Sequence, residues 1–365
     1  MDQLQLDDDS ELPIAPFTRG VVCLPPGSTR VADADEEVFL LYTNLAGHHK
    51  TDTAGTTKFR GLGHIDSHED ILAISLALGT PAHDLGSSGH VGKVHVKHKG
   101  RASSSQKRKA RKSRAEDVPT LEVEIFQDKT ALRSRKGDTG SVLWHASVDF
   151  AEAVLRQVHQ KVPDGFLSPE TLSEVHVVEL GAGTGLLSIV LSPFVRHYTV
   201  TDIPELVPLI RKNVGHNLAT GVSATSPQKA AGKHSSPPPL LTSSNVTATA
   251  LDWVQLHNAP ASLRAKLAPD DPADVVLVVD CIYHPSLLPA LLTTIDHLTV
   301  PGRTAVIVVV ELRAEDVIRE FLQMWLDKAE DGRWEIWSVG GLIEGPYAVW
   351  VGWKDALSGN DQPER

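Results

Sequence analysis

Alternating glycines mark the first segment whose residue types could do chemistry. Gly181, Gly183 and Gly185 follow the short apolar run 175–180 and precede a helical pattern that starts at Leu186. Glycine adopts positive φ without strain and lets a ligand approach the backbone, while a helix N-terminus offers free N–H groups. The spacing Gly-x-Gly-x-Gly differs from the Gly-x-Gly-x-x-Gly of dinucleotide-binding proteins. We therefore expect a strand-to-helix turn that a small ligand can approach closely.

Asp202 strengthens this interpretation, because it ends the next predicted strand, residues 197–201. A carboxylate at that strand tip can accept hydrogen bonds from both ribose hydroxyls of an adenosine ligand. Two alternatives stay open. The turn could be structural, with Asp202 capping the following helix, or the ligand could be a nicotinamide cofactor. The nicotinamide alternative predicts the longer glycine pattern and a separate catalytic constellation, of which the sequence shows no sign.

A second polar group ends another strand. Asp280 and Tyr283 belong to the string Asp-Cys-Ile-Tyr, which ends the predicted strand 274–281. Open α/β sheets bind ligands at the carboxyl ends of their strands, so both side chains are candidates for catalysis. The alternative is a strand-end turn with a packed aromatic ring.

Strands and helices alternate along the part of the chain that contains these residues. Near-continuous runs of β-branched residues predict strands that are buried on both faces, as in a parallel sheet. The pattern therefore predicts an α/β fold: an open, mostly parallel sheet with helices on both faces and an antiparallel element at its end. The expected strands are residues 175–180, 197–201, 248–253, 274–281, 303–312, 334–339 and 347–353, and the expected helices include 205–217, 287–298 and 314–327. Nearer the N-terminus, residues 37–45 are interpreted as a strand and 68–78 as a helix.

Composition divides the chain into folded parts and polar segments. Residues 1–87 are expected to form an N-terminal extension whose strand and helix pack on the core, and residues 118–355 the main domain. Residues 88–117 are basic and residues 221–244 are rich in Ser, Pro, Ala and Thr. Neither segment can bury enough apolar area to offset the entropy lost on ordering, so both are predicted to be flexible insertions. Residues 356–365 are expected to be a C-terminal tail.

The overall composition argues against several classes of protein. The net charge of −11 at pH 7 argues against a general nucleic-acid binder. The two cysteines, Cys23 and Cys281, are too few for a Cys-rich zinc site or a disulfide framework. The N-terminus has no apolar signal region, and no apolar run approaches the roughly 20 residues of a membrane span. We expect a cytoplasmic protein.

The motifs together resemble a known family. The string Glu-Leu-Gly-Ala-Gly-Thr-Gly at 179–185, with Thr-Asp-Ile-Pro-Glu at 201–205, resembles the seven-strand class I S-adenosylmethionine-dependent methyltransferases, whose sheet is Rossmann-like. Within that class, Asp-x-x-Tyr at 280–283 resembles a group of protein-lysine methyltransferases. That group also carries a Trp ahead of the glycine strand and a Leu-Asp-Trp after the third strand, here Trp144 and 251–253.

The resemblance implies that S-adenosylmethionine is the cofactor and that the glycine turn holds it. Gly181, Ala182 and Gly183 would pass beneath its methionine part, with Glu179 nearby, and Asp202 would hold the ribose.

Three further residues are implied to contact the cofactor. Trp253 would flank the adenine, Trp144 would close the methionine end, and the backbone of Cys281 would lie near the cofactor. Ordinary core packing is the alternative for both tryptophans, since Trp is usually well buried.

Asp280 and Tyr283 would then face a lysine acceptor. A lysine must be neutral to attack, although its free pKa is about 10.4. A carboxylate can orient the incoming ammonium group, and desolvation beside Tyr283 would favour loss of its proton. Methyl transfer from a sulfonium is an in-line displacement that depends on alignment, so no metal is expected.

The implied partner is a protein substrate. The residues at 280–287, with 309–313, are similar to those of fungal ribosomal lysine methyltransferases, which suggests a protein of the large (60S) ribosomal subunit. Three alternatives stay open: a chaperone or elongation factor as substrate, a small-molecule or RNA substrate, and a non-catalytic binding module with the same fold. RNA enzymes of this class often carry Pro-Pro where residues 281–282 are Cys-Ile. We expect a monomer.

Two other polar segments carry weaker predictions. Residues 64–70 contain metal-ligand types, but they open a predicted helix, where Asp and Ser are expected as caps. The basic run 107–114 could be a nuclear-import signal or a nucleic-acid patch, or simply a solvated loop. The run has no interleaved aromatic residue to stack on bases, so sequence-specific RNA recognition is not expected.

Overall fold

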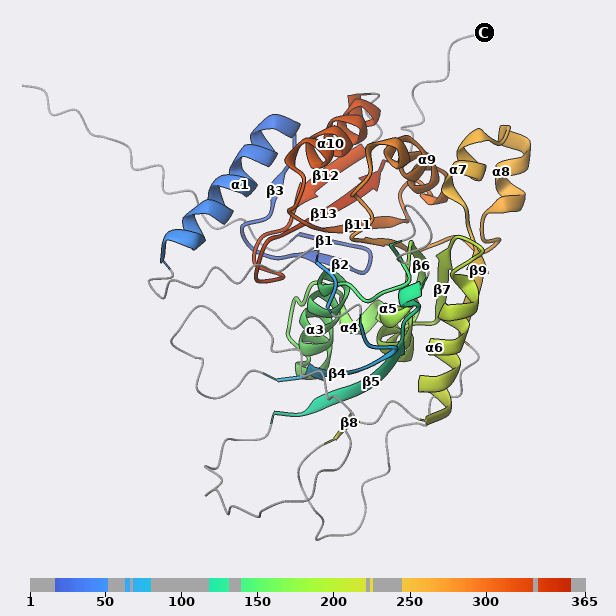
Figure 1. The fold of residues 1–365 in the computed structure, drawn as a ribbon. Coiled ribbons are helices and arrows are strands. Elements are labelled where there is room, and N and C mark those ends of the chain that lie inside the picture. The colour runs from blue at the N-terminus through green and yellow to red at the C-terminus, as the bar shows by residue number, and fades with distance from the viewer. Residues whose placement is uncertain are drawn as a thin grey trace, which may run out of the picture.

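The computed structural model contains one large mixed sheet with helices on both faces (Figure 1). It describes residues 17–51, 63–65, 68–79, 118–130, 139–220, 224–225, 245–330 and 334–355. The predicted basic insertion 88–117, the tail 356–365 and most of the insertion 221–244 lie outside the described residues.

The central sheet has the strand order β3-β12-β13-β11-β10-β6-β7-β9. Strands β9, β7, β6, β10 and β11 run parallel to one another, and β13 is antiparallel to both of its neighbours. This arrangement confirms the predicted mostly parallel α/β sheet with an antiparallel strand at its end. A short eighth strand, β3, extends the expected seven at the edge beside β12. The bounds are Thr29–Arg30 (β3), His176–Leu180 (β6), His197–Asp202 (β7), Val246–Ala250 (β9), Val275–Val279 (β10), Ala305–Glu311 (β11), Trp334–Ser338 (β12) and Tyr347–Lys354 (β13).

Helices cover the two faces of this sheet, which is why its strands are apolar on both sides. Successive residues of β10 belong to two hydrophobic clusters, one on each face of the sheet. Val275 and Leu277 pack on one face, and Val276 and Val278 pack on the other. One face packs against α3 (His145–Gln160), α5 (Leu186–Leu191) and α6 (Val207–Thr220). The opposite face packs against α1 (Ala34–Thr51), α7 (Trp253–Asn258), α9 (Leu288–Leu298) and α10 (Glu315–Glu330). Of two short helices, α4 (Pro169–Leu172) buries Leu172 in the core, whereas α8 (Ala261–Leu267) has no buried residue.

Residues 37–45 are helical, so the prediction of a strand there was wrong. Helix α1 begins with three acidic residues in its first turn, which favours a helix because its N-terminus is partly positive. Val38 and Tyr42 lie one helical turn apart and pack with the cluster around α10, whereas Phe39 is exposed. The apolar run therefore follows the period of a helix face. The buried Glu37 carboxylate accepts hydrogen bonds from Trp350 at 2.9 Å and Ser338 at 2.7 Å, which joins α1 to the sheet.

The predicted helix at 68–78 was also wrong: the segment forms strand β4 (Ile71–Ala77). Leu72, Ile74 and Leu76 are buried while the residues between them are half-exposed. This alternation has the period of two that a strand requires.

Strand β4 belongs to a separate small sheet. It pairs antiparallel with β5 (Thr120–Phe126), and β5 also pairs with the two-residue strand β8 (Ala224–Thr225), which lies within the predicted insertion. A hairpin of β1 (Phe17–Arg19) and β2 (Val22–Leu24) contributes further N-terminal packing. Residues of the N-terminal segment belong to both hydrophobic clusters, but its elements differ from those predicted.

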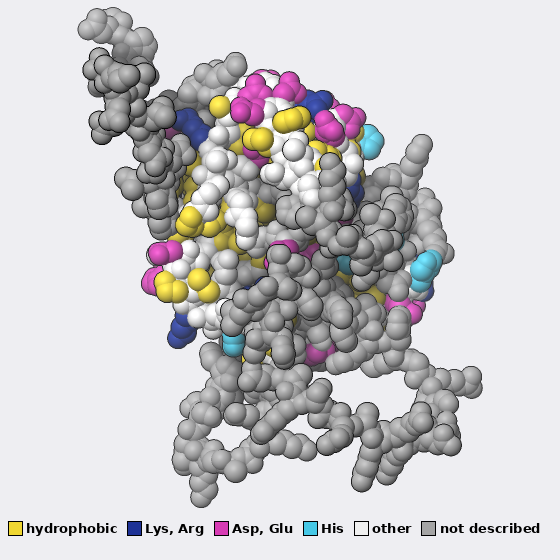
Figure 2. Space-filling model, turned by 90° about the vertical axis from the view of Figure 1, so that its left-hand side faces the viewer, with side chains coloured by type: hydrophobic (Ala, Val, Ile, Leu, Met, Phe, Trp, Pro, Cys, Tyr) yellow, Lys and Arg dark blue, Asp and Glu magenta, His cyan; other side chains and the backbone are white. Residues whose placement is uncertain are grey.

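The surface around α1 and α10 is acidic. The first turns of these helices carry Asp35, Glu36, Glu315 and Asp316. Figure 2 shows acidic side chains gathered at the top of the face that includes this part of the molecule. Among the described residues, no helix combines the length and apolar character that crossing a membrane requires.

Candidate active site at the carboxyl ends of the strands

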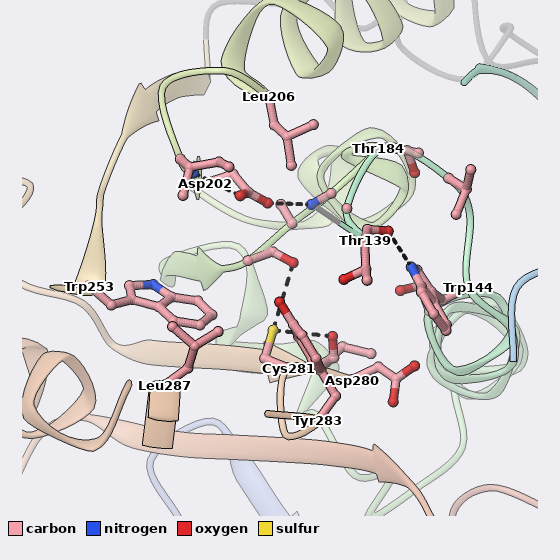
Figure 3. Close-up of a pocket in the computed structure, with 18 of the residues that line it drawn as sticks. Thr139, Trp144, Thr184, Asp202, Leu206, Trp253, Asp280, Cys281, Tyr283 and Leu287 are labelled. Carbon is pink, nitrogen blue, oxygen red and sulfur yellow. Dashed lines mark hydrogen bonds between the residues drawn. The ribbon is translucent and has the colours of Figure 1, made fainter. Parts of the chain in front are cut away.

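A cavity of about 240 Å³ opens at the carboxyl ends of β6, β7 and β10 (Figure 3). Every residue predicted for the site except Glu179 lines this cavity: Trp144, Gly181, Ala182, Gly183, Asp202, Trp253, Asp280, Cys281 and Tyr283. The location is the one expected for a ligand in an open α/β sheet.

The glycine turn forms one wall and leaves no room for side chains. Gly181, Gly183 and Gly185 have φ of 66°, 57° and 79°, values that glycine adopts without strain. A Cβ on Gly181 would lie 2.6 Å from Cys281 Sγ, and a Cβ on Gly183 would lie 2.8 Å from the carbonyl oxygen of Gly140. Any side chain at Gly181 or Gly183 would therefore collide with other residues that line the cavity, so bare backbone is required here.

Asp202 is held by the turn. Its Oδ2 accepts a hydrogen bond from Gly183 N at 2.7 Å, and its Oδ1 accepts one from Ile203 N at 2.7 Å. The side chain is 8% exposed and lines the cavity beside Leu206. The two N–H groups fix the carboxylate at the end of β7, where a ligand's hydroxyl groups can reach it.

Glu179 lies behind the turn and does not line the cavity. Its carboxylate accepts a hydrogen bond from the Tyr198 hydroxyl at 2.9 Å and is buried. Burial raises the pKa of Glu179 to about 8, the Tyr198 hydrogen bond opposes this, and the nearby charge of Asp202 adds to it. The side chain is therefore mostly protonated at neutral pH.

Trp253 and Cys281 form the part of the cavity wall next to Gly181. The Leu-Asp-Trp motif follows β9, which ends at Ala250, and Asp252 caps α7 by accepting hydrogen bonds from Val254 N and Gln255 N. This cap turns the first helical residue, Trp253, toward the glycines. The indole Nε1 of Trp253 is buried and has no hydrogen-bond partner among the described residues.

Trp144 closes the other end of the cavity just before α3. Its Nε1 donates a hydrogen bond to the Thr139 carbonyl oxygen at 2.9 Å, as Figure 3 shows. The backbone of His64 bridges to Trp144, and their rings meet edge to face with centroids 6.1 Å apart. Among the described residues, no cluster of three possible metal ligands occurs.

Asp280 lies on the floor of the cavity, and Tyr283 lies at its rim. The Asp280 side chain is 3% exposed and pairs with the Arg313 guanidinium, while Tyr283 is 37% exposed. Asp280 has φ of 60°, a left-handed conformation that few non-glycine residues adopt. Burial raises the pKa of Asp280, and the charge and hydrogen bond of Arg313 oppose that rise.

Sequence reasoning missed several cavity residues. Thr139 and Gly140 line it from the loop before α3, and Leu206 lines it from the start of α6. Arg313 was part of a motif that carried the family resemblance, but no role followed from it. Because the partner of Arg313 lies 33 residues away in sequence, only the strand pairing of β10 with β11 reveals their contact.

Taken together, the strand order, the glycine turn and the cavity at the strand ends define a class I methyltransferase with a Rossmann-like sheet. Residues 126–328 match the protein family described as lysine methyltransferase, and the chain belongs to that family. S-adenosylmethionine is its methyl donor, which confirms the predicted cofactor.

Several curated proteins are similar to this chain. Ribosomal lysine N-methyltransferase 5 of Eremothecium gossypii is 30% identical over 235 residues, which cover 56% of this chain and 72% of that protein. A diaminohydroxyphosphoribosylamino-pyrimidine deaminase of Schizosaccharomyces pombe is 29% identical, over 55% of this chain and 41% of that protein. EEF1A lysine methyltransferase 3 of Xenopus tropicalis is 30% identical, over 40% of this chain and 51% of that protein. The chain thus spans about half of the Xenopus protein and less than half of the Schizosaccharomyces protein.

The cavity residues fit S-adenosylmethionine. The backbone of Gly181 and Gly183 forms a cradle that a Cβ would fill, so a ligand can lie against bare peptide groups. Trp253 and Asp202 line the cavity together with this cradle, one with an aromatic ring and one with a carboxylate.

Proposed function

We propose that this chain transfers a methyl group from S-adenosylmethionine to the side-chain amine of a lysine in a large-subunit ribosomal protein. The observation that carries the proposal is the buried Asp280 carboxylate on the wall of the same cavity as the glycine cradle. When bound, the cofactor supplies an electrophilic methyl group on a positively charged sulfur.

The chain's own residues bind and orient the donor in this proposal. Gly181, Ala182 and Gly183 present peptide groups to the methionine part, and Asp202 accepts the ribose hydroxyls. Trp253 packs against the adenine beside Cys281. These assignments agree with where each side chain lies in the cavity wall.

The acceptor side depends on Asp280, Tyr283 and Trp144. Asp280 attracts and orients the ammonium form of the lysine, and the rings of Tyr283 and Trp144 at the cavity wall exclude water from the amine. Exclusion of water lowers the pKa of a lysine, since the charged form loses its hydration. The proton then leaves to solvent before the amine attacks.

A ribosomal substrate is supported by the similarity to ribosomal lysine N-methyltransferase 5, which covers 72% of that protein. The net charge of −11 also suits the basic proteins that bind ribosomal RNA. An elongation factor is the second candidate, because the Xenopus relative is named for EEF1A.

The test is transfer of a radiolabelled methyl group from S-adenosylmethionine to purified ribosomal subunits, and separately to purified elongation factor, from cells that lack the enzyme. We expect one labelled large-subunit protein, with the label recovered as methyl-lysine after hydrolysis. Label on the elongation factor alone would keep the enzyme class and reject the ribosomal substrate. Absence of label from both, with the cofactor bound, would reject both substrates.

A further inference from the structure

Arg313 lies two residues after the end of β11 and is not among the residues that line the cavity. The Arg313 Nη2 group pairs with Asp280 Oδ2 and, at 2.9 Å, with Glu311 Oε2. Both carboxylates are buried, with side-chain exposures of 3% and 6%, and Arg313 itself is 26% exposed. A buried carboxylate without a partner is costly, so Arg313 supplies the counter-charge for both buried acids.

The Arg313 guanidinium also reaches Trp144, which lines the cavity. Arg313 Cζ lies 4.9 Å from the centre of the Trp144 ring, within the range of a cation–π contact. Trp144 is in turn fixed by its hydrogen bond to Thr139. One side chain thus connects the strand end that carries Asp280 with the ring at the cavity's other end.

Gly63 encloses the guanidinium from outside. It has φ of 94°, and a Cβ at this position would overlap the Arg313 Nη2 group and lie 2.7 Å from Glu311 Oε2. The chain at 63–65 is held in place because His145 N donates to the Gly63 carbonyl oxygen and Ile65 N donates to that of Leu143, each at 2.9 Å. The backbone therefore restricts Arg313 to the place between Gly63 and Trp144.

The Asp280 backbone needs this restraint. Its left-handed φ of 60° is a conformation that persists only when the surroundings impose it. Asp280 N donates to the Val309 carbonyl oxygen at 2.7 Å, and Oδ1 accepts a hydrogen bond from Glu311 N at 3.3 Å. The backbone contact fixes the main chain, and the ion pair with Arg313 fixes the direction of the carboxylate.

We propose that Arg313 is a positioning residue that holds the Asp280 carboxylate toward the acceptor amine and couples it to Trp144. The proposal rests on the proposed role of Asp280 as the group that receives the lysine ammonium. An alternative role predicts the opposite result: if Arg313 were only a neighbouring positive charge, its removal would make the cavity more attractive to a second cation.

The test compares binding of two cofactor analogues to the full chain by calorimetry. Sinefungin carries an ammonium group in place of the transferred methyl, whereas S-adenosylhomocysteine carries no charge there. Their affinity ratio therefore reports how well the cavity receives a cation at the transfer position, without requiring any substrate. For the Arg313→Met variant we expect the preference for sinefungin to fall by roughly tenfold, as for loss of a charge-assisted hydrogen bond, with affinity for S-adenosylhomocysteine unchanged.

Arg303→Met is the matched control. Arg303 lies at the other end of the same strand and pairs with Asp274 at 2.7 Å, far from the cavity residues. We expect this variant to keep the wild-type ratio. Asp280→Asn should lose the preference as Arg313→Met does, and Arg313→Lys should restore it in part, because lysine keeps the charge but not the planar group over Trp144.

A second variant, Gly63→Ala, tests the proposal if Arg313→Met does not fold. Gly63→Ala displaces the guanidinium without deleting it and should lower the same ratio. An unchanged or increased ratio in the folded Arg313 or Gly63 variants would overturn the proposal, as would an unchanged ratio in Asp280→Asn. If the ratio falls as expected but no lysine is methylated by the wild type, the substrate proposal fails while Arg313 remains a positioning residue of the cavity.

Discussion

Two buried aspartates face the same cavity with different partners, one at the end of β7 and one just after β10, on either side of β6. Asp202 accepts hydrogen bonds from two backbone N–H groups, whereas Asp280 pairs with the side chain of Arg313. Backbone donors hold a carboxylate in one place, while an ion pair also supplies a counter-charge. This difference is the physical basis for assigning Asp202 to the donor and Asp280 to the acceptor.

Substitution at the two positions should therefore separate binding from transfer. Asp202→Ala is expected to weaken S-adenosylmethionine binding by on the order of 100-fold, because the hydrogen bonds from the two ribose hydroxyls to the charged carboxylate are lost. Asp280→Asn should bind the cofactor as the wild type does and lose methyl transfer. Calorimetry and a labelled-methyl assay measure the two quantities, and equal loss of binding in both variants would contradict the division of roles.

Glu179 should give folding stability a specific pH dependence. Its pKa is about 8 in the folded protein, above the ordinary value of 4.5, so the folded state binds the extra proton between these values. The stabilisation from this group is complete below pH 4.5 and is lost as the pH rises through 8. Glu179→Gln has no carboxyl group to titrate but still accepts the hydrogen bond from Tyr198.

We expect the stability of Glu179→Gln relative to the wild type to increase between pH 5 and about 8 and then to level off. Urea unfolding of both proteins at several pH values measures this difference, in which contributions from other titrating groups cancel. A difference that does not change with pH would show that Glu179 is ionised in the folded protein.

At the scale of elements, two asparagines connect α6 to the small sheet, and one of them also reaches the glycine turn. Asn213 accepts a hydrogen bond from Phe126 N and donates to the carbonyl oxygens of Phe126 and Thr184. One turn later, Asn217 makes the same paired contacts with Glu124. The two amides act as a strand partner for β5 beyond its short pairing with β8, and only Asn213 reaches the turn.

Replacing these asparagines should separate stability from cofactor binding. Asn213→Ala and Asn217→Ala are each expected to cost about 2 kcal/mol in the free energy of unfolding, since each leaves buried peptide groups unpaired. Asn213→Ala should also weaken S-adenosylhomocysteine binding several-fold, whereas the matched variant Asn217→Ala should not. Urea unfolding and calorimetry test this, and equal effects of both variants on binding would argue against a link from α6 to the turn.

The sequence was most informative where burial on both faces of the sheet left an unbroken apolar run. Strands β6, β7, β10 and β11 were predicted from such runs, and each lies within the central sheet. The two N-terminal errors arose from local preferences. Residues 37–45 contain Val, Phe and Tyr, which favour a strand, while Ala and Leu in 68–78 favour a helix. Tertiary packing overrode these local preferences.

Some cavity residues could be assigned from the sequence, and others could not. Gly181, Asp202 and Asp280 could be found because strand ends in a parallel sheet converge on one edge. Gly140 and Arg313 could not be assigned, because their contacts with Gly183 and Asp280 depend on loop packing and strand register. Glu179 was placed near the cofactor, but its side chain points behind the turn toward Tyr198.

At the scale of the whole molecule, the negative charge should attract a basic substrate. The net charge is −11, and acidic side chains gather on the face shown in Figure 2. Attraction between separated charges is screened at physiological salt, where the Debye length is about 8 Å. We expect kcat/KM for ribosomal protein to fall severalfold between low and high salt while kcat changes little. Steady-state kinetics over this range test the expectation, and a kcat/KM independent of salt would contradict it.

The most direct test of the account is mass spectrometry of large-subunit proteins, taken from cells without the enzyme and incubated with S-adenosylmethionine and either the wild type or Asp280→Asn. The account predicts one lysine-containing peptide that gains methyl groups with the wild type and stays unmodified with the variant, although both proteins bind the cofactor. Equal methylation by the two proteins, or methyl groups only on residues other than lysine, would contradict it.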